Sequence, residues 1–197
     1  YITYRVLDIA DLTVDGSLCT GGAVCIMLML SGQNVWVALA GAFLAGMVSG
    51  FATGLLHTFM GIPAILSGIL TQLGLYSINL KIMGKANQAI NVDKFDLLVS
   101  LRFIKNVPFY KNTILLVAII IALLIVFLYW FFGTELGASL RATGANPNMA
   151  RAQGINTDTG KVLGLMLSNG LVALSGALLA QYQGFADSSM GKGAIVI

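Results

Sequence analysis

The chain has 197 residues, of which 57% are hydrophobic and only 10% charged, and its formal net charge is +3 at neutral pH. Soluble domains carry roughly 25% charged residues, so this composition excludes a soluble domain. The small positive charge is not interleaved with aromatic residues, which argues against nucleic-acid binding. From Gly16 to Leu80 there is no Asp, Glu, Lys or Arg, enough for about three membrane spans. We therefore predict an all-α, polytopic transmembrane helical bundle that forms one domain over residues 1–197.

The chain begins with the tail of a helix, Tyr1 to Leu7, followed by the polar interruption DIADLTVDGS, residues 8–17. Ionisable groups at membrane depth are costly and indicate function by default. If this stretch is unwound beside a water-filled path, its carboxylates and backbone groups can meet a substrate ammonium. The alternative is an ordinary surface turn in which Asp15 caps the next helix. Both interpretations remain open, and the candidate pathway residues are Asp8, Asp11, Thr13, Asp15 and Ser17.

Apolar runs predict a short helix from Leu18 to Leu30, a span from Val35 to about Met60, a reversal ending at Pro63, and a span from Ala64 to Leu80. Small residues recur every four positions along the second of these and along a later span. Such smooth faces let helices approach closely in lipid. We expect them to pack within the bundle, with a dimer seam as the alternative. The glycines concerned are Gly46, Gly50, Gly54, Gly160 and Gly164.

A polar segment from Lys81 to Lys111 separates these spans from the next one, Asn112 to Gly133. Within it, FDLLVSLRFIKNVPF is amphipathic and suits a helix lying flat in the membrane interface. The polar segment holds six Lys or Arg against two Asp, whereas the later segment 134–161 holds three against two acidic residues. One span separates them, so they face opposite sides. The positive-inside rule taken alone favours the first as cytoplasmic.

The segment 134–161 lies between two charge-free runs and contains its own helix signals. Thr134 and Glu135 predict a helix start, and Gly144 predicts a left-handed C-terminal end. Asn146 then predicts the cap of a second, short helix whose first residue is Pro147. Gly154 closes that helix after about two turns. A short stiff helix at the membrane surface is a suitable part for another protein to push on.

This segment and the span after it resemble bacterial ABC-importer permeases of the family that contains the branched-chain amino acid and ribose permeases. The matching residues are Leu140-Arg141-Ala142, Gly144, Asn146, Ala150, Gly154-Ile155-Asn156 and the stretch 174–177. Upstream, DIADLTVDGS is similar to the family's Asp-Leu-Ser-Val-Gly-Ser segment, with Asp15 inserted. Its wording looks most like a subgroup linked to the uptake of amino acids, tryptophan and tyrosine in particular.

The resemblance implies a non-catalytic permease subunit in the bacterial inner membrane, with no cofactor of its own because a partner ATPase subunit binds the ATP. It also implies a second permease copy and an external substrate-binding protein. The segment 134–161 would supply the coupling helix that docks on the ATPase. Arg141 and Arg151 would then pair with partner carboxylates, or alternatively anchor on lipid phosphates. The expected coupling residues are Arg141, Asn146, Pro147, Met149, Arg151, Gln153 and Gly154.

Other constellations are weaker. His57 and Ser49 lie eight residues apart on one helix, about 12 Å, too far for a hydrolytic dyad, and no metal-ligand cluster occurs. Gln72 and Asn169 are lone amides in spans and are expected to make interhelical hydrogen bonds, with substrate contact as the alternative. The rival function is a secondary transporter or channel that binds a coupling ion at Asp8–Asp15. Because the chain begins and ends inside apolar patterns, we expect a fragment that lacks the start of its first span and one or more C-terminal spans.

Overall fold

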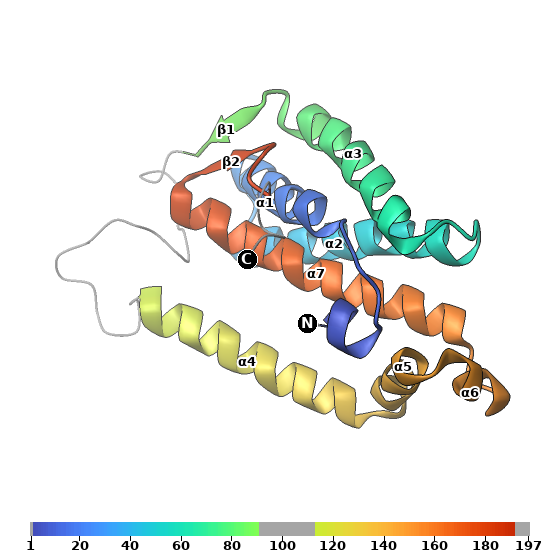
Figure 1. Cartoon of the computed structure of the whole chain (residues 1–197). Coiled ribbons are helices and arrows are strands. Elements are labelled where there is room, and N and C mark those ends of the chain that lie inside the picture. Colours follow the sequence, from blue (N-terminus) through green and yellow to red (C-terminus); the bar gives the residue numbers. More distant parts are fainter. Residues whose placement is uncertain (1, 91–112, 192–197) are drawn as a thin grey trace.

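A computed structural model describes residues 2–90 and 113–191 of the chain. Within these ranges the chain forms long α-helices, together with shorter helices and two short strands (Figure 1). The amphipathic stretch 95–109 lies outside the described residues. The elements are η1 (Ile2–Val6), α1 (Val14–Leu30), α2 (Val35–Thr58), α3 (Ala64–Met83), β1 (Asn87–Ala89), α4 (Thr113–Gly133), α5 (Glu135–Ala145), α6 (Pro147–Ala152), α7 (Thr157–Gln183) and β2 (Phe185–Asp187).

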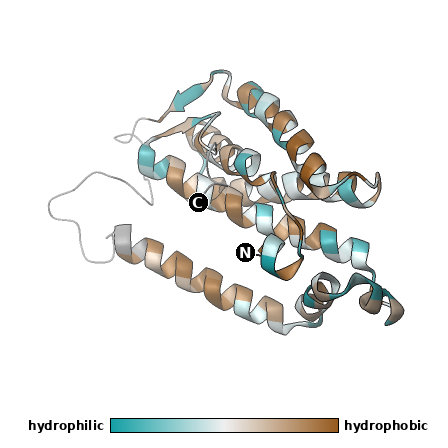
Figure 2. Cartoon of the chain, viewed as in Figure 1, coloured by the Kyte–Doolittle hydropathy of each residue, from teal (hydrophilic) through white to brown (hydrophobic). Residues whose placement is uncertain are grey.

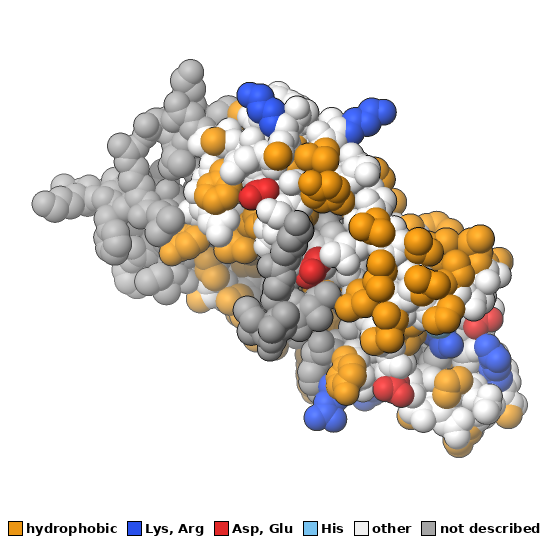
Figure 3. All heavy atoms as spheres, turned by 45° about the horizontal axis from the view of Figure 1, so that its top comes forward, with side chains coloured by type: hydrophobic (Ala, Val, Ile, Leu, Met, Phe, Trp, Pro, Cys, Tyr) orange, Lys and Arg blue, Asp and Glu red, His pale blue; other side chains and the backbone are white. Residues whose placement is uncertain are grey.

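Three of the described helices, α2, α3 and α7, are long and apolar enough to cross a membrane. A fourth span results if α4 and α5 are taken as one bent pair, whose parts meet at 76°. Hydrophobic residues run along these helices, while hydrophilic ones gather at β1 and near α6 (Figure 2). In the space-filling view, hydrophobic side chains lie between Lys and Arg side chains near the two ends (Figure 3). The protein is an all-α transmembrane bundle, as its composition predicts.

Helix α7 is the centre of the bundle and packs along both α1 and α2, while α3 covers α1 and α2 (Figure 1). The α2–α7 seam is close because glycine replaces larger side chains there. A Cβ atom at Gly50 would overlap the carbonyl oxygen of Leu165, and one at Gly54 would lie 3.1 Å from the Cα of Val162. Gly46 likewise lies against α7, at Asn169. In this structure the small-residue face of α2 therefore packs inside the chain.

Several helix boundaries differ from the sequence predictions. Helix α1 begins at Val14, so Asp15 lies in its first turn and the prediction that Asp15 caps the helix is wrong. Thr13 takes the cap position instead, and its backbone N–H donates to the Asp11 side chain at 2.9 Å. Helix α7 begins at Thr157, because the Asn156 side chain caps it through the N–H groups of Asp158 and Thr159.

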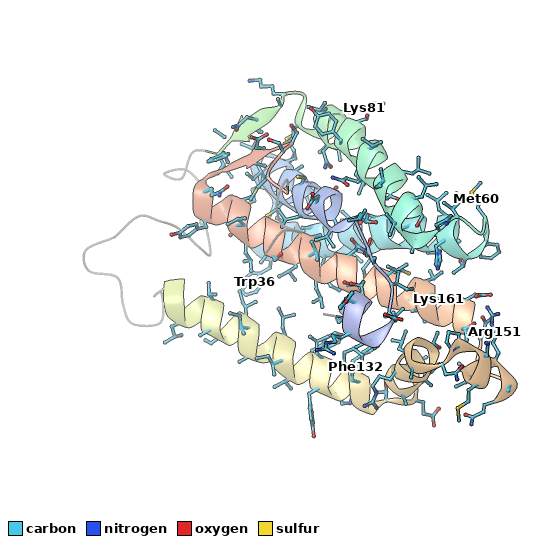
Figure 4. The ribbon with its side chains drawn as sticks, in the orientation of Figure 1. Trp36, Met60, Lys81, Phe132, Arg151 and Lys161 are labelled. Carbon is cyan, nitrogen blue, oxygen red and sulfur yellow. The ribbon has the colours of Figure 1, made fainter. Side chains whose placement is uncertain are left out.

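The two ends of the bundle carry different features (Figure 1). At one end α3 stops at Gly84, which has a left-handed φ of 66°, and β1 then pairs antiparallel with β2. This short strand pair was not predicted from the sequence. At the other end lie α6 and the α2–α3 turn. Figure 4 shows the same separation, with Lys81 at the first end and Met60 and Arg151 at the second.

Candidate functional site

Helix α5 is fixed to the end of α4 by its first turn. The Thr134 hydroxyl accepts the N–H of Gly137 at 3.4 Å and donates to the Phe131 carbonyl at 2.6 Å. The predicted cap at Thr134 is thus confirmed, with Glu135 in the first turn. Arg141 Nη2 donates to the Phe132 carbonyl at 3.1 Å across the bend. The sharp angle between α4 and α5 is therefore held by hydrogen bonds on both sides.

Helix α6 is a short, stiff element with both ends satisfied. The Asn146 side chain accepts the N–H of Met149 at 3.1 Å, and Pro147 occupies the first helical position, as predicted. Gly154 follows with a φ of 83°, which favours glycine, and the Ile155 N–H returns to the helix at 3.0 Å from the Ala150 carbonyl. A helix closed in this way can be displaced as one piece.

The outer surface of α6 is exposed, whereas its inner side is held by α7. Met149 is 59% exposed, and Ala150 is buried. Arg151 Nε donates to the Thr157 hydroxyl at 2.7 Å, and its Nη2 pairs with Asp158 at 3.0 Å. The guanidinium of Arg151, expected to meet a partner carboxylate, thus already binds the first turn of α7 (Figure 4). The remaining predicted member of this group, Gln153, is exposed at the end of α6.

Gly144 does not end α5 in a left-handed conformation, so that prediction is wrong. The helix continues to Ala145, and the break comes from the extended backbone of Asn146, with φ −156° and ψ 97°. A Cβ atom at Gly144 would overlap the carbonyl oxygen of Val6. The glycine is needed for a close backbone approach rather than for a turn.

The segment Asp8–Ser17 is joined to α2 and α7 by buried side-chain hydrogen bonds. We call these six residues the polar network: Asp11, Thr13, Ser17, Ser49, Thr53 and Asn169. The Thr13 and Thr53 hydroxyl oxygens are 2.7 Å apart, and those of Ser17 and Ser49 are 2.8 Å apart. Five of the six residues are buried, and Asp11 is half-buried. The network therefore ties the polar break to two spans.

Asn169 is the branch point of the polar network. Its Nδ2 donates to Asp11 Oδ2 at 2.7 Å and to the Leu165 carbonyl at 3.0 Å. Its Oδ1 accepts the Ser17 hydroxyl at 2.6 Å. The predicted interhelical hydrogen bond of Asn169 is confirmed. With no exposed surface, this amide has all of its hydrogen-bonding directed at protein groups.

The predicted pathway residues thus divide into two groups. Thr13 and Ser17 are fully buried and bonded within the network, and Asp11 bridges to α7. Asp8 is exposed and holds a left-handed φ of 54°, unusual for a residue with a side chain. Asp15 has one carboxylate oxygen buried without a hydrogen-bond partner among the described residues. The break therefore combines a left-handed bend at Asp8, a carboxylate at Asp11 that is bonded to α7, and a carboxylate at Asp15 that has one unbonded oxygen among the described residues.

Sequence reasoning missed Ser49 and Thr53 as members of the network. A signal existed, because Thr13 and Ser17 are four residues apart, as are Ser49 and Thr53, so each pair lies on one helix face. His57, in the last turn of α2, has its Nδ1 2.8 Å from the Ile62 carbonyl oxygen and so contacts the backbone of the α2–α3 turn. Within residues 2–90 and 113–191, no three His, Cys, Asp or Glu side chains form a metal-ligand group.

Comparisons with known proteins identify the family of the chain. The family model described as branched-chain amino acid transport system / permease component matches residues 1–197. The chain is 40% identical over its full length to a tyrosine transport system permease protein of Clostridioides difficile, covering 63% of that protein. It is 37% identical to an uncharacterized protein of Rickettsia prowazekii, again over its full length, covering 67% of it. Over 96% of its length it is 31% identical to an autoinducer 2 import system permease protein of Yersinia pestis, covering 51%. No solved structure matches significantly.

Proposed function

Because the chain belongs to the family of branched-chain amino acid and ribose type ABC-importer permeases, we propose that it forms the membrane-spanning path of an ATP-driven importer. A separate ATPase subunit binds and hydrolyses the ATP, and the permease itself carries no catalytic residues. A second permease copy completes the path, and an external binding protein delivers the solute. The protein resides in the bacterial inner membrane, with α6 on the cytoplasmic side.

The observation that carries this proposal is the construction of α6. The helix is capped by Asn146, stopped by Gly154 and tied to α7 through Arg151, so a push on it moves α7 as well. Its exposed Met149 offers a flexible apolar side chain for a socket on another protein. An ATPase that grips α6 can therefore drive the alternating access of the path by rigid-body displacement.

The transported solute is proposed to be an amino acid, with an aromatic side chain as the first candidate. Two lines support this choice: the sequence similarity to the tyrosine permease, and the carboxylates of Asp8, Asp11 and Asp15 at the polar break. A carboxylate beside the path is suited to the ammonium group of an amino acid. Uptake of labelled tyrosine into cells, competed by other amino acids, tests the substrate directly.

The docking role of α6 is tested with the full-length protein and its cognate ATPase. Met149→Glu places a charge in the proposed apolar contact and is expected to abolish co-purification of the ATPase. The matched control is Met60→Glu, because Met60 is similarly exposed, at 68%, on the α2–α3 turn at the same end of the bundle. Loss of the ATPase in the control as well as the variant, or in neither, would refute docking at α6.

One observation favours the rival function, ion-coupled transport. One carboxylate oxygen of Asp15 is buried and has no hydrogen-bond partner within residues 2–90 and 113–191, so it could bind a proton or cation. The two mechanisms differ in their energy source. Uptake that stops when ATP is depleted at a maintained membrane potential supports the importer, whereas uptake that persists under those conditions and collapses with an ionophore supports ion coupling.

A further inference from the structure

Residues 2–9 lead into the polar break and pack against α5 and α7. Segment 2–9 runs from η1 into the bundle, and its apolar side chains join α5 and α7 in one buried cluster. The buried members of this cluster are Ile2, Leu7, Ile9, Leu140, Leu165 and Leu167. The apolar side chains of the segment are therefore part of the core, although the segment leads directly into the non-helical stretch.

The contact with α5 is between backbones. A Cβ atom at Gly144 would overlap the Val6 carbonyl oxygen and lie 2.9 Å from the Leu7 Cα, closer than real Cβ atoms come. No side chain stands between α5 and the segment here. Side chains can absorb a displacement by changing rotamer, whereas two backbones in contact transmit it.

Leu7 also contacts α7. Leu7 is only 4% exposed, and its Cδ1 lies 2.6 Å from where a Cβ at Gly164 would be. Five residues farther along α7, about 7.5 Å, Asn169 binds Asp11. Both ends of the bend at Asp8 are therefore attached to α7, and its start also touches α5.

We propose that Gly144 and Leu7 are positioning residues that carry the displacement of α5 and α6 into the polar break at Asp8–Asp15. This inference rests on the proposed function, since it supplies the route by which ATPase motion reaches the path. The route has three steps: α6 moves with α5 and with the first turn of α7, α5 pushes the backbone at Val6, and Leu7 turns the bend at Asp8. The structure supplies the connections along this route: the Arg151–Asp158 pair between α6 and α7, the backbone contact of Gly144 with Val6, and the chain itself from Leu7 into the left-handed Asp8.

The proposal is tested by the ratio of solute taken up to ATP hydrolysed, rather than by uptake alone. In the full-length permease, reconstituted in liposomes with its ATPase and binding protein, Gly144→Ala is expected to preserve ATPase binding and ATP hydrolysis. Uptake per ATP hydrolysed is expected to fall about tenfold, within the range typical of coupling between sites. The matched control is Gly74→Ala on α3, where no atom lies within 4 Å of the new methyl group. An unchanged ratio for Gly144→Ala overturns the proposal.

A second measurement remains decisive if Gly144→Ala folds poorly. Spin labels at exposed positions report the distance from Tyr4 to Leu136 on α5 and from Tyr4 to Ile65 on α3. In the otherwise unmodified protein, ATP binding is expected to change the second distance and leave the first constant. In Leu7→Ala, which removes bulk and creates no clash, the first distance is expected to change too. A Tyr4 label that separates from Leu136 without the substitution, or does not move relative to Ile65, overturns the proposal.

These outcomes separate the two proposals. If the unsubstituted full-length protein neither binds an ATPase nor couples hydrolysis to uptake, the proposed function fails. If that protein couples normally and Gly144→Ala couples equally well, only the positioning role fails. The unsubstituted protein thus tests the proposed function, and Gly144→Ala tests the positioning role, in the same assay.

Discussion

Replacing Asn169 should break the polar network at its branch point and lower the stability of the fold. Asn169→Ala removes the donor to Asp11 and the acceptor for Ser17, both across helices. Because Asn169 has no exposed surface, water cannot take over either bond without entering the α2–α7 seam. Ser17 keeps Ser49 and the Thr13 carbonyl as neighbours, so the half-buried carboxylate of Asp11 bears most of the loss.

The expected cost follows from the two bonds. Interhelical hydrogen bonds in membrane proteins contribute about 0.6 kcal/mol on average, which we assign to the Ser17 bond. A hydrogen bond to a charged group contributes about 1.5–3 kcal/mol, and the half-burial of Asp11 favours the lower end. Asn169→Ala should therefore lower the free energy of unfolding by about 2 kcal/mol.

The assay is reversible unfolding in mixed detergent micelles, followed by tryptophan fluorescence. The matched control is Ser175→Ala on the same helix, because Ser175 is exposed and its hydroxyl bonds only to the Val172 carbonyl one turn back. Surface substitutions of that kind stay within about 0.5 kcal/mol. The control separates loss of the network from a general effect of altering α7.

A second variant tests the geometry rather than the burial. Asn169→Asp keeps the acceptor for Ser17 but sets a carboxylate about 2.7 Å from the Asp11 oxygen, so it should be more destabilising than Asn169→Ala at neutral pH. Adding Asp11→Asn should recover part of the loss by restoring a donor between the two side chains. Equal stability of Asn169→Ala and the Ser175→Ala control, or no recovery in the Asn169→Asp/Asp11→Asn pair, would refute the reasoning.

Three further predictions concern packing, capping and orientation. Gly50→Ala should destabilise the bundle by about 1–3 kcal/mol through overpacking, whereas Gly74→Ala should not, as compared by the same unfolding assay. Asn146→Ala should cost about 1 kcal/mol of local stability and speed amide hydrogen exchange in α6 while leaving that of α2 unchanged. In intact cells, an impermeant thiol reagent should label a cysteine introduced at Lys85 and not one at Asn148; the reverse pattern would invert the proposed topology.

Local signals in the sequence predicted the elements whose formation is local. The caps at Thr134 and Asn146 and the position of Pro147 are confirmed because each depends on residues within three positions. The spans at α2, α3 and α7 were predicted correctly from long uncharged runs, whereas the helix in the run from Asn112 to Gly133 is counted as a span only together with α5. The α2 glycine stripe likewise predicted a close helix approach, although the sequence could not name the partner helix.

The errors come from residues whose role depends on distant parts of the chain. Gly144 serves a close approach to Val6, and a glycine required for that looks the same in sequence as one required for a left-handed turn. The network around Asn169 joins residues more than 150 positions apart, which no local pattern encodes.

The polar break also links folded stability to the transmission proposed above. Backbone groups at membrane depth need partners within the protein. Two N–H groups of the break find them locally: that of Ile9 donates to the Thr3 carbonyl at 3.0 Å, and that of Thr13 donates to the Asp11 side chain. Asp11 is in turn held by α7 through Asn169, so the break cannot move independently of that helix.

This linkage separates two classes of variant. A substitution in the polar network should lower folded stability and uptake together, because one set of bonds serves both. A substitution at Met149 should lower ATPase binding and uptake with little change in the unfolding free energy, because that side chain is mostly exposed. Plotting uptake against stability for both classes should therefore give two distinct lines. A single common line would mean that α6 acts on the path only through the overall stability of the bundle.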